Sequence, residues 1–366
     1  MTQGVRYRSA RSEDLPACTR IWAASIGDYY ERRLHQRWEP GDLDPLQRLL
    51  AHLLTTDPAL FVVATLGAEA ADAAADAAAE EVVAFGSANR RGAVWFLSML
   101  FVRPDLQDGG IGRAILARLL PLNARTEAAL APDGHERRTG GDRRGPDANR
   151  GPADRRGPEE RRTGFRRPIL GTATDSAQPI SNALYARYGM VPRVPAFQLL
   201  GRPPLHADLP GLPPGVRAIP FDSIASGPPG GSGHGELVAA IGAVDRTVIG
   251  HERGQDHRFL RLEGRRGFLY QGADGTSLGY GYAAPSGRLG PVAAIDPQLV
   301  VRIVGHLLFA VRPPGASAIW LPGGSDDVYA VLLRAGLRIE GFPALFCWNR
   351  PVADFSRYIP ISLALI

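Results

Sequence analysis

The sequence predicts an α/β fold with mixed sheets, arranged as two αβ domains in tandem. Runs rich in β-branched and aromatic residues alternate with segments of helical periodicity along most of the chain. A segment also recurs, because residues 186–190 align with 333–337 and residues 195–203 align with 343–351 after one extra residue is allowed. The length of 366 residues exceeds that of one small domain. We therefore predict a first domain over 1–203, a linker over 204–215 and a diverged copy over 216–366.

The first half contains predicted strands and helices in regular alternation. Ser12-Glu13-Asp14 is a typical helix start, and residues 93–102 (AVWFLSMLFV) form a continuous apolar run that suits a buried strand. The predicted strands lie at 4–11, 60–66, 82–88, 93–102, 168–173 and 190–200. The predicted helices lie at 12–33, 44–56, 112–122 and 179–188.

The second half repeats this layout more loosely after a segment rich in proline and glycine, residues 203–215. The predicted strands lie at 216–221, 268–271, 277–283, 290–295 and 316–321. The predicted helices lie at 236–249, 297–311 and 326–333.

A long insertion interrupts the first half at residues 124–167, where Asp-Arg-Arg-Gly-Pro and close variants repeat. Its apolar content is too low to bury a core, so we predict a disordered surface insertion. It holds twelve arginines and eight acidic residues and so carries four of the five net positive charges of the chain. It lacks the interleaved aromatic residues on which bases stack, so we expect weak, salt-sensitive association with polyanions and no specific nucleic acid.

The composition excludes several classes of protein. All 42 basic residues are arginine, which removes lysine Schiff bases and the lysine of a P-loop. Cys18 and Cys347 lie in apolar segments, so we predict two reduced thiols in the core. No leader-like start and no apolar run of membrane-spanning length occurs, so we expect a cytoplasmic protein without membrane or metal partners.

A glycine-rich turn follows the apolar strand and opens the next predicted helix. Gly109, Gly110 and Gly112 lack the Cβ atoms that would keep a phosphate away from the backbone amides at the helix N-terminus. The turn is not G-x-G-x-x-G and has no P-loop lysine. Taken alone, it is either a diphosphate site or an ordinary tight turn.

The wider segment resembles the GNAT superfamily of N-acetyltransferases, in which an apolar strand, V-x-P-x-x-Q and a Q-x-x-G-x-G turn open a helix. Residues 101–113 (FVRPDLQDGGIGR) match every defining position of that signature. Residues 179–189, which end in NALYARYG, resemble the second motif of the family. The resemblance extends from Val5 to Gly201.

The resemblance implies that acetyl-CoA binds as co-substrate. In the family, amides of the turn hold the pyrophosphate, and backbone groups of Phe101 and Val102 pair with the pantetheine. Arg113 either adds charge near the phosphates or is solvated, and Asn182 either meets the pantetheine or bonds to local backbone. The residues assigned to the cofactor are Phe101, Val102, Gln107, Asp108, Gly109, Gly110, Ile111, Gly112, Arg113 and Asn182.

The resemblance also assigns a general acid but leaves the base open. Tyr185 occupies the position whose hydroxyl protonates the CoA sulfur, with an interior tyrosine as the alternative. The strand over 93–102 lacks a carboxylate, and Ser98 is either a relay through water or simply a small core residue. Candidate acids in the acceptor region, which are equally expected to be solvated, are Asp28, Glu31 and Glu39. Docking of Ile366 near the site is a further hypothesis.

We therefore expect an N-acetyltransferase that moves an acetyl group to the amine of an unidentified small-molecule or peptide acceptor, with no prediction of oligomeric state. The missing carboxylate keeps a non-catalytic, acyl-CoA-binding regulatory protein as the alternative. In the second half, the stretch that follows Ile295, residues 296–301 (DPQLVV), has no glycine at the positions of the turn, and Leu332 replaces the tyrosine. We expect it to bind no CoA, to complete the fold and to wall the acceptor pocket.

Overall fold

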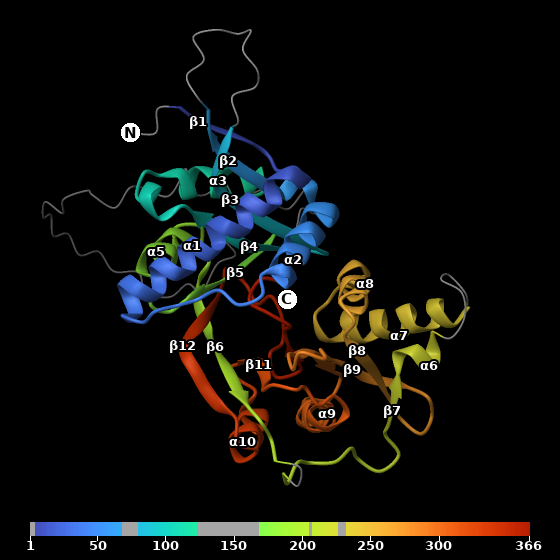
Figure 1. The fold of residues 1–366 in the computed structure, drawn as a ribbon. Coiled ribbons are helices and arrows are strands. Elements are labelled where there is room, and N and C mark those ends of the chain that lie inside the picture. Colours follow the sequence, from blue (N-terminus) through green and yellow to red (C-terminus); the bar gives the residue numbers. More distant parts are fainter. Residues whose placement is uncertain (1–3, 68–79, 123, 125–167, 205–206, 226–231) are drawn as a thin grey trace, which may run out of the picture.

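A computed structural model describes residues 4–67, 80–122, 124, 168–204, 207–225 and 232–366 (Figure 1). The predicted insertion, apart from Ala124, lies outside the described residues. Among the described residues, no helix combines the length and the apolar character needed to cross a membrane. Cys18 and Cys347 are buried and free, and burial raises the pKa of each thiol to about 12, which confirms two core thiols.

The two halves share an order of elements: a strand, two helices, three strands, a helix, a strand, a helix and a strand. The second half adds a short helix after its first strand and a short strand at its end. The first half consists of β1 (Val5–Ser9), α1 (Leu15–Leu34), α2 (Asp44–Thr56), β2 (Phe61–Leu66), β3 (Glu81–Arg91), β4 (Val94–Val102), α3 (Ile111–Leu119), β5 (Ile169–Asp175), α5 (Pro179–Ala186) and β6 (Val191–Gly201).

The second half consists of β7 (Arg217–Pro220), a short α6 (Phe221–Ile224), α7 (Ser232–Val248), α8 (Gly254–Leu262), β8 (Arg266–Gln271), β9 (Ser277–Ala283), β10 (Leu289–Ala294), α9 (Pro297–Ala310), β11 (Ser317–Pro322), α10 (Asp326–Arg334) and β12 (Arg338–Trp348), followed by β13 (Tyr358–Ile359). The repeated order confirms the predicted α/β fold and its tandem arrangement.

The two halves exchange their last long strands. One sheet has the order β1-β2-β3-β4-β5-β12-β6-β11, and the other has the order β13-β10-β9-β8-β7. Strand β12 of the second half lies between β5 and β6, antiparallel to both, and β6 in turn pairs with β11 of the second half. The sheet that carries the motif residues is therefore complete only when both halves are folded.

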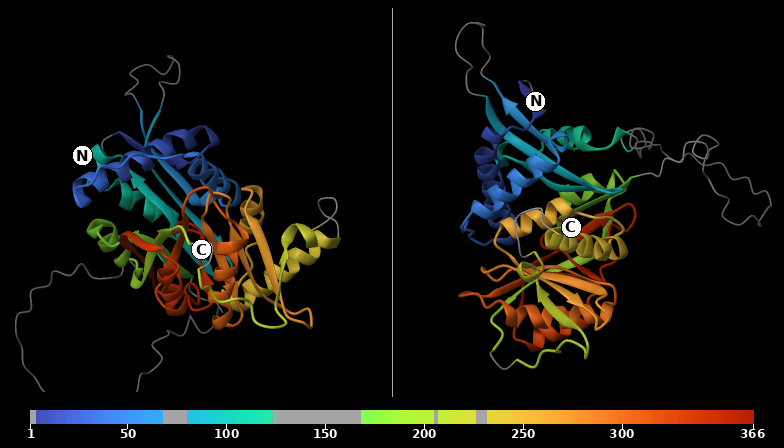
Figure 2. Two further views of the ribbon diagram at one scale, coloured as in Figure 1. Left: turned by 60° about the horizontal axis from the view of Figure 1, so that its bottom comes forward. Right: turned by 90° about the vertical axis from the view of Figure 1, so that its right-hand side faces the viewer.

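Helices cover both faces of this sheet in the first half. Alternate residues of β2 point to opposite faces, so Val62 packs with the core under α3 and α5, whereas Val63 packs with the core under α1 and α2. Figure 2 shows the second half packed against one end of the first, with the C-terminus between them.

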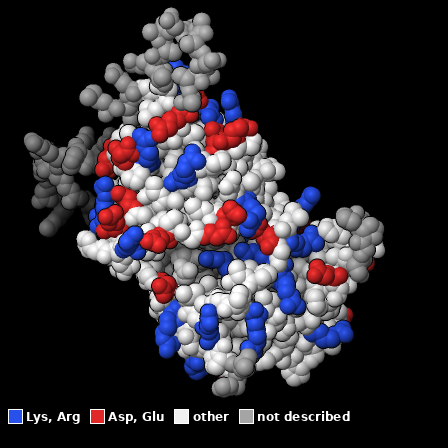
Figure 3. All heavy atoms as spheres, in the orientation of Figure 1, with Lys and Arg blue, Asp and Glu red and all other residues white. Residues whose placement is uncertain are grey.

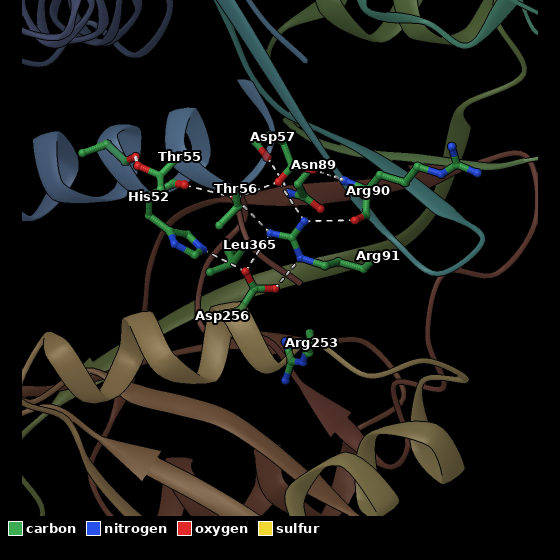
Figure 4. A network of polar contacts seen from close by, with 12 residues as sticks. His52, Thr55, Thr56, Asp57, Asn89, Arg90, Arg91, Arg253, Asp256 and Leu365 are labelled. Carbon is green, nitrogen blue, oxygen red and sulfur yellow. Dashed lines mark hydrogen bonds and ion pairs between the residues drawn. The ribbon is translucent and has the colours of Figure 1, made fainter. Parts of the chain in front are cut away.

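A buried ionic network joins the halves (Figure 4). Arg91 at the end of β3 is only 2% exposed and makes two hydrogen bonds, of 2.8 and 2.7 Å, to the carboxylate of Asp256 on α8. Its third nitrogen donates to Asp57 at 2.8 Å. The His52 ring of α2 lies 2.8 Å from Asp256 and stacks on Phe259 of α8. Because both sides contribute paired buried charges, the network fixes how the second half docks.

Candidate functional site

Strands β4 and β5 separate part-way along their length. They pair in parallel from Val94 with Ile169 to Leu97 with Thr172, and no pairing between them continues beyond that point. A register shift against β3 makes Ser98 an extra residue on β4, which is a β-bulge at the point of separation. The bulge turns the end of β4 away from β5, and a wedge opens between their carboxyl ends.

The glycine-rich turn lies at the open end of this wedge. Gly110 caps α3 with a φ of 80°, and Asp108 also has a positive φ, of 66°. The first helical hydrogen bond runs from the amide of Ala114 to the carbonyl of Gly110, at 3.0 Å. The amides of Ile111, Gly112 and Arg113 precede it and therefore lack helical partners. With the helix dipole, these amides form a site for an anion.

The rest of the turn is exposed and fixed to the strand before it. Residues 107–110 and Arg113 are exposed, whereas Ile111 is buried. The side chain of Gln107 donates to the carbonyl of Val102 at 3.1 Å, and Ser25 of α1 donates to the same carbonyl at 3.0 Å. Phe101 lies opposite Phe85 on β3 and stacks on its ring. The motif residues of strand and turn are thus brought together at one end of the wedge.

Asn182 lies on α5 beside the end of β5. Its side-chain nitrogen donates to the backbone carbonyls of Asp175 and Gln178, at 3.1 and 2.9 Å. Its side-chain oxygen Oδ1 is buried and has no hydrogen-bond partner within the described part of the chain. A buried acceptor without a donor is costly, so this oxygen suits a ligand that supplies an N–H or O–H donor.

Tyr185, also on α5, is 5% exposed and packs in the core beneath α3. Burial raises the pKa of its hydroxyl, while interaction with Ser181 acts in the opposite direction. The hydroxyl is therefore protonated at neutral pH, and it holds its proton more tightly than the hydroxyl of a solvent-exposed tyrosine does.

No protein-family model and no curated protein matches the chain. Solved structures do match it. A protein of Pyrococcus horikoshii assigned as an acetyltransferase is 14% identical, with a TM-score of 0.63 over 100% of this chain and 97% of the other. A GCN5-related N-acetyltransferase of Sphaerobacter thermophilus is also 14% identical, with a TM-score of 0.54 over 98% and 99%. This chain has the GNAT fold. Because both matches span the whole chain, the likeness includes the second half of the fold.

Of the three acids that the resemblance places in the acceptor region, Glu31 and Glu39 are exposed and Asp28 is half-buried. The carboxylate of Asp28 pairs with Arg32 at 2.7 Å, and Glu39 is 74% exposed and pairs with Arg37. Sequence reasoning missed a fourth acid, Asp175, because the predicted strand ended at residue 173 whereas β5 continues to Asp175 at the wedge. Its position directly before the second GNAT-like motif was the available signal.

Ile366 lies against the first half. It is 7% exposed and lines a small cavity with Asn89 and Val94, and the Asn89 amide donates to the hydroxyl of Ser98 at 2.8 Å. A larger cavity of about 750 Å³ adjoins it between the halves, where Val94 and Ile169 begin β4 and β5. That cavity is at the opposite end of the strands from the glycine-rich turn. Figure 3 shows the hollow between the halves, with arginine predominating on the lower half of that face.

In the second half, a strand of the chain itself lies where the first half has the wedge beside β4. Strands β10 and β11 are joined by one parallel bridge, from Arg288 to Ala318, and then β13 pairs with Val292 and Ala293 of β10. Tyr358 of β13 is fully buried and accepts a hydrogen bond from the equally buried Arg253. The chain's own backbone thus fills the position that stays open beside β4.

Among the described residues, no group of three His, Cys, Asp or Glu side chains is arranged to hold a metal ion.

Proposed function

We propose that this chain is an N-acetyltransferase that binds acetyl-CoA in the wedge between β4 and β5 and transfers the acetyl group to the amine of a small-molecule or peptide acceptor. The observation that carries the proposal is the wedge itself, which has unpaired amides at one end and an unpartnered Asn182 oxygen at its side. The likeness in fold to assigned acetyltransferases supports it.

In this proposal the residues of the chain bind and orient acetyl-CoA and protonate its departing sulfur. The amides of Ile111, Gly112 and Arg113 bind the diphosphate, and Asn182 accepts from a pantetheine amide. Acetyl-CoA supplies an activated thioester when bound. Tyr185, which is protonated at neutral pH, donates its hydroxyl proton to the departing sulfur. The amine attacks the thioester directly.

The test is a thiol-release assay with acetyl-CoA and a panel of amines, which compares the wild type with Tyr185→Phe. Removal of a general acid should lower kcat by about 10²-fold or more and leave acetyl-CoA affinity unchanged. Tyr188→Phe is the matched control, since Tyr188 is half-buried in the turn that follows α5 and has no assigned role. An unchanged rate in Tyr185→Phe would refute the acid role.

Two other outcomes separate the alternatives. If acetyl-CoA binds and no amine turns over, a non-catalytic acyl-CoA-binding protein becomes the better description. If acetyl-CoA does not bind, the argument from the glycine-rich turn fails together with the proposed function.

A further inference from the structure

Two arginines of the second half lie in one row across its sheet. Ala283 at the end of β9 lies opposite Arg266 of β8 and also pairs with the first residue of β10. One residue further along the chain, Ala284 therefore lies between Arg265 and Arg288, and its amide donates to the Arg288 carbonyl at 2.9 Å. Residues opposite each other on antiparallel strands share a face of the sheet. Both arginine side chains thus extend from the same face, on either side of one methyl group.

The two arginines approach each other above this methyl group. Neighbouring strands are about 4.8 Å apart, so the Cα atoms of Arg265 and Arg288 are about 10 Å apart. The side chain of Arg265 spans this gap, because its Nη1 donates a long hydrogen bond, of 3.4 Å, to the backbone carbonyl of Arg288. Both arginines are half-buried, whereas Pro285 and Ser286 in the turn beside Ala284 are exposed. Solvent therefore reaches this end of the row.

No carboxylate in the described part of the chain forms an ion pair with Arg265 or Arg288. The acid nearest to them in the sequence is Glu263, and its carboxylate pairs with Arg48 of α2 at 2.5 Å. The Nε atom of Arg265 is buried and has no hydrogen-bond partner among the described residues. A charged donor that is removed from water without a partner lowers the stability of the fold. The pair therefore lacks the negative charge that would compensate its burial.

The electrostatics of the pair agree with this geometry. Burial and the neighbouring Arg288 lower the pKa of the Arg265 guanidinium to about 10, although Glu263 acts in the opposite direction. Burial lowers the pKa of Arg288 as well. Both groups remain charged at neutral pH, so two positive charges lie side by side with part of their hydration removed.

We infer that Arg265 and Arg288 form a binding site for a phosphate group of a small molecule, above Ala284 in the second half. The planar guanidinium matches the geometry of phosphate oxygens, and a phosphate group carries about two negative charges at neutral pH, enough to neutralise both arginines. A carboxylate would neutralise only one. The site lies in the half to which the proposed function assigns no ligand, so the inference does not depend on that function.

An anion bound at this row would stabilise the contact between the halves. Tyr282, two residues before Ala284, packs in the core with Leu260 of α8, so the row lies on the face that α8 covers. The amide of Arg265 donates to the carbonyl of Leu260 at 3.3 Å, which joins the row to the last turn of α8. Helix α8 also carries Asp256, whose carboxylate bonds to the first half. A ligand that binds only the folded chain shifts the unfolding equilibrium toward the folded state.

The experiment titrates inorganic phosphate into the full chain at constant ionic strength, with binding followed by calorimetry. All proteins carry Gly112→Asp, which places a negative charge in the first turn of α3 and so prevents phosphate binding there. We expect one equivalent of phosphate, with acetate bound at least about tenfold more weakly. Arg265→Gln and Arg288→Gln should each weaken phosphate binding by at least about tenfold. Arg266→Gln is the matched control, because Arg266 extends from the other face, donates to the Ala310 carbonyl at 3.0 Å and should leave the Kd unchanged.

Thermal unfolding gives a second measurement that a purely structural role of the arginines would not reproduce. Without phosphate, Arg288→Gln should raise Tm by about 2 °C, because it removes the repulsion between like charges. With phosphate in excess, it should lack the increase in Tm that the protein with both arginines shows.

Four results would overturn the inference: no phosphate binding, an unchanged Kd in either glutamine variant, equal affinities for phosphate and acetate, or a lower Tm of Arg288→Gln without phosphate. The last result would show that the chain itself supplies the partner of the pair. Should a glutamine variant not fold, Arg265→Lys keeps the charge but loses the planar fork. An unchanged phosphate Kd in Arg265→Lys then overturns the site.

Discussion

Asp108 carries backbone strain in the glycine-rich turn. Its φ of 66° is in the left-handed region, which costs a non-glycine residue roughly 1–2 kcal/mol. Asp108→Gly should therefore stabilise the fold by about 1 kcal/mol in denaturant titration. It should also tighten acetyl-CoA binding, because a negative charge leaves the diphosphate site. Gln107→Gly is the control, since φ there is −65° and glycine should destabilise slightly. A less stable Asp108→Gly would show that the side chain contributes more than the strain costs.

Gly112 allows a test of the anion site that does not damage the fold. A Cβ there meets Val102 Cγ2 at 3.6 Å, an ordinary contact, and a carboxylate in the first turn of a helix is favourable for stability. Gly112→Asp should fold normally and lose acetyl-CoA binding by at least about tenfold, because its charge repels the diphosphate. Calorimetric titration measures this. Gln255→Asp makes the same kind of change in the first turn of α8 and should bind as wild type.

At the scale of elements, the contact of β3 with α8 depends on one carboxylate. Asp256 is 1% exposed and is bonded to Arg91 and His52. Asp256→Asn removes a negative charge that neutralises the buried Arg91 guanidinium. The substitution should lower the free energy of unfolding by about 3–5 kcal/mol. Asp354→Asn, an exposed partner of Arg357, should change stability by less than about 1 kcal/mol. Similar values for both variants would show that the network does not hold the interface.

The pKa of the Asp256 carboxyl determines how the stability of the fold depends on pH. Its hydrogen bonds with Arg91 and His52 outweigh burial and hold the pKa of Asp256 well below its usual range. In the unfolded chain the pKa of this carboxyl is about 3.9, and in the folded protein it is lower. The ionised carboxylate therefore stabilises the fold fully above the unfolded pKa. This stabilisation is lost as the pH falls through the folded pKa. Acid titration of unfolding should show a loss of stability below about pH 4 that is smaller in Asp256→Asn. An identical profile in both proteins would contradict this assignment.

Most elements were predictable because their signals are local. Helix α2 spans the predicted residues 44–56, and the continuous apolar run 93–102 forms β4 with its first residue outside the strand. Helix α8 was missed because its sequence, GQDHRFLRL, is largely polar and has few apolar positions to mark a face. The insertion of β12 between β5 and β6 could not be predicted, because strand order depends on pairings between residues far apart in the sequence.

The residues of the candidate site also divide into those with a local sequence signal and those without one. The glycine-rich turn and Asn182 belong to contiguous motifs, so both could be predicted from the spacing of residues in the sequence. Asp175 has no comparable signal in the sequence, because β5 continues two residues beyond the predicted strand. The pairing of Arg91 with Asp256 spans 165 residues and has no local pattern. Residues that act through tertiary contact leave no periodic signal in the sequence.

At the scale of the whole molecule, two halves of one fold differ in what fills the wedge. In the first half it stays open beside β4, and in the second half β13 pairs with β10 there. Tyr358 of β13 is held by Arg253, whose guanidinium also bonds Tyr280 and lies 3.6 Å from Asp245. Displacing β13 would leave these buried groups unpaired, which a ligand could not easily offset.

We therefore expect one acetyl-CoA per chain. Equilibrium dialysis should give a single equivalent for the wild type, because in the described second half β13 pairs with β10 and the side chain of Asp296 already accepts from the first-turn amide of Gln298. Gly112→Asp should then bind none rather than half, since the second wedge cannot take over. A residual equivalent in Gly112→Asp would show that β13 yields to the cofactor and that the halves are functionally alike. The absence of that equivalent would leave the second half with a structural contribution, strand β12 in the shared sheet.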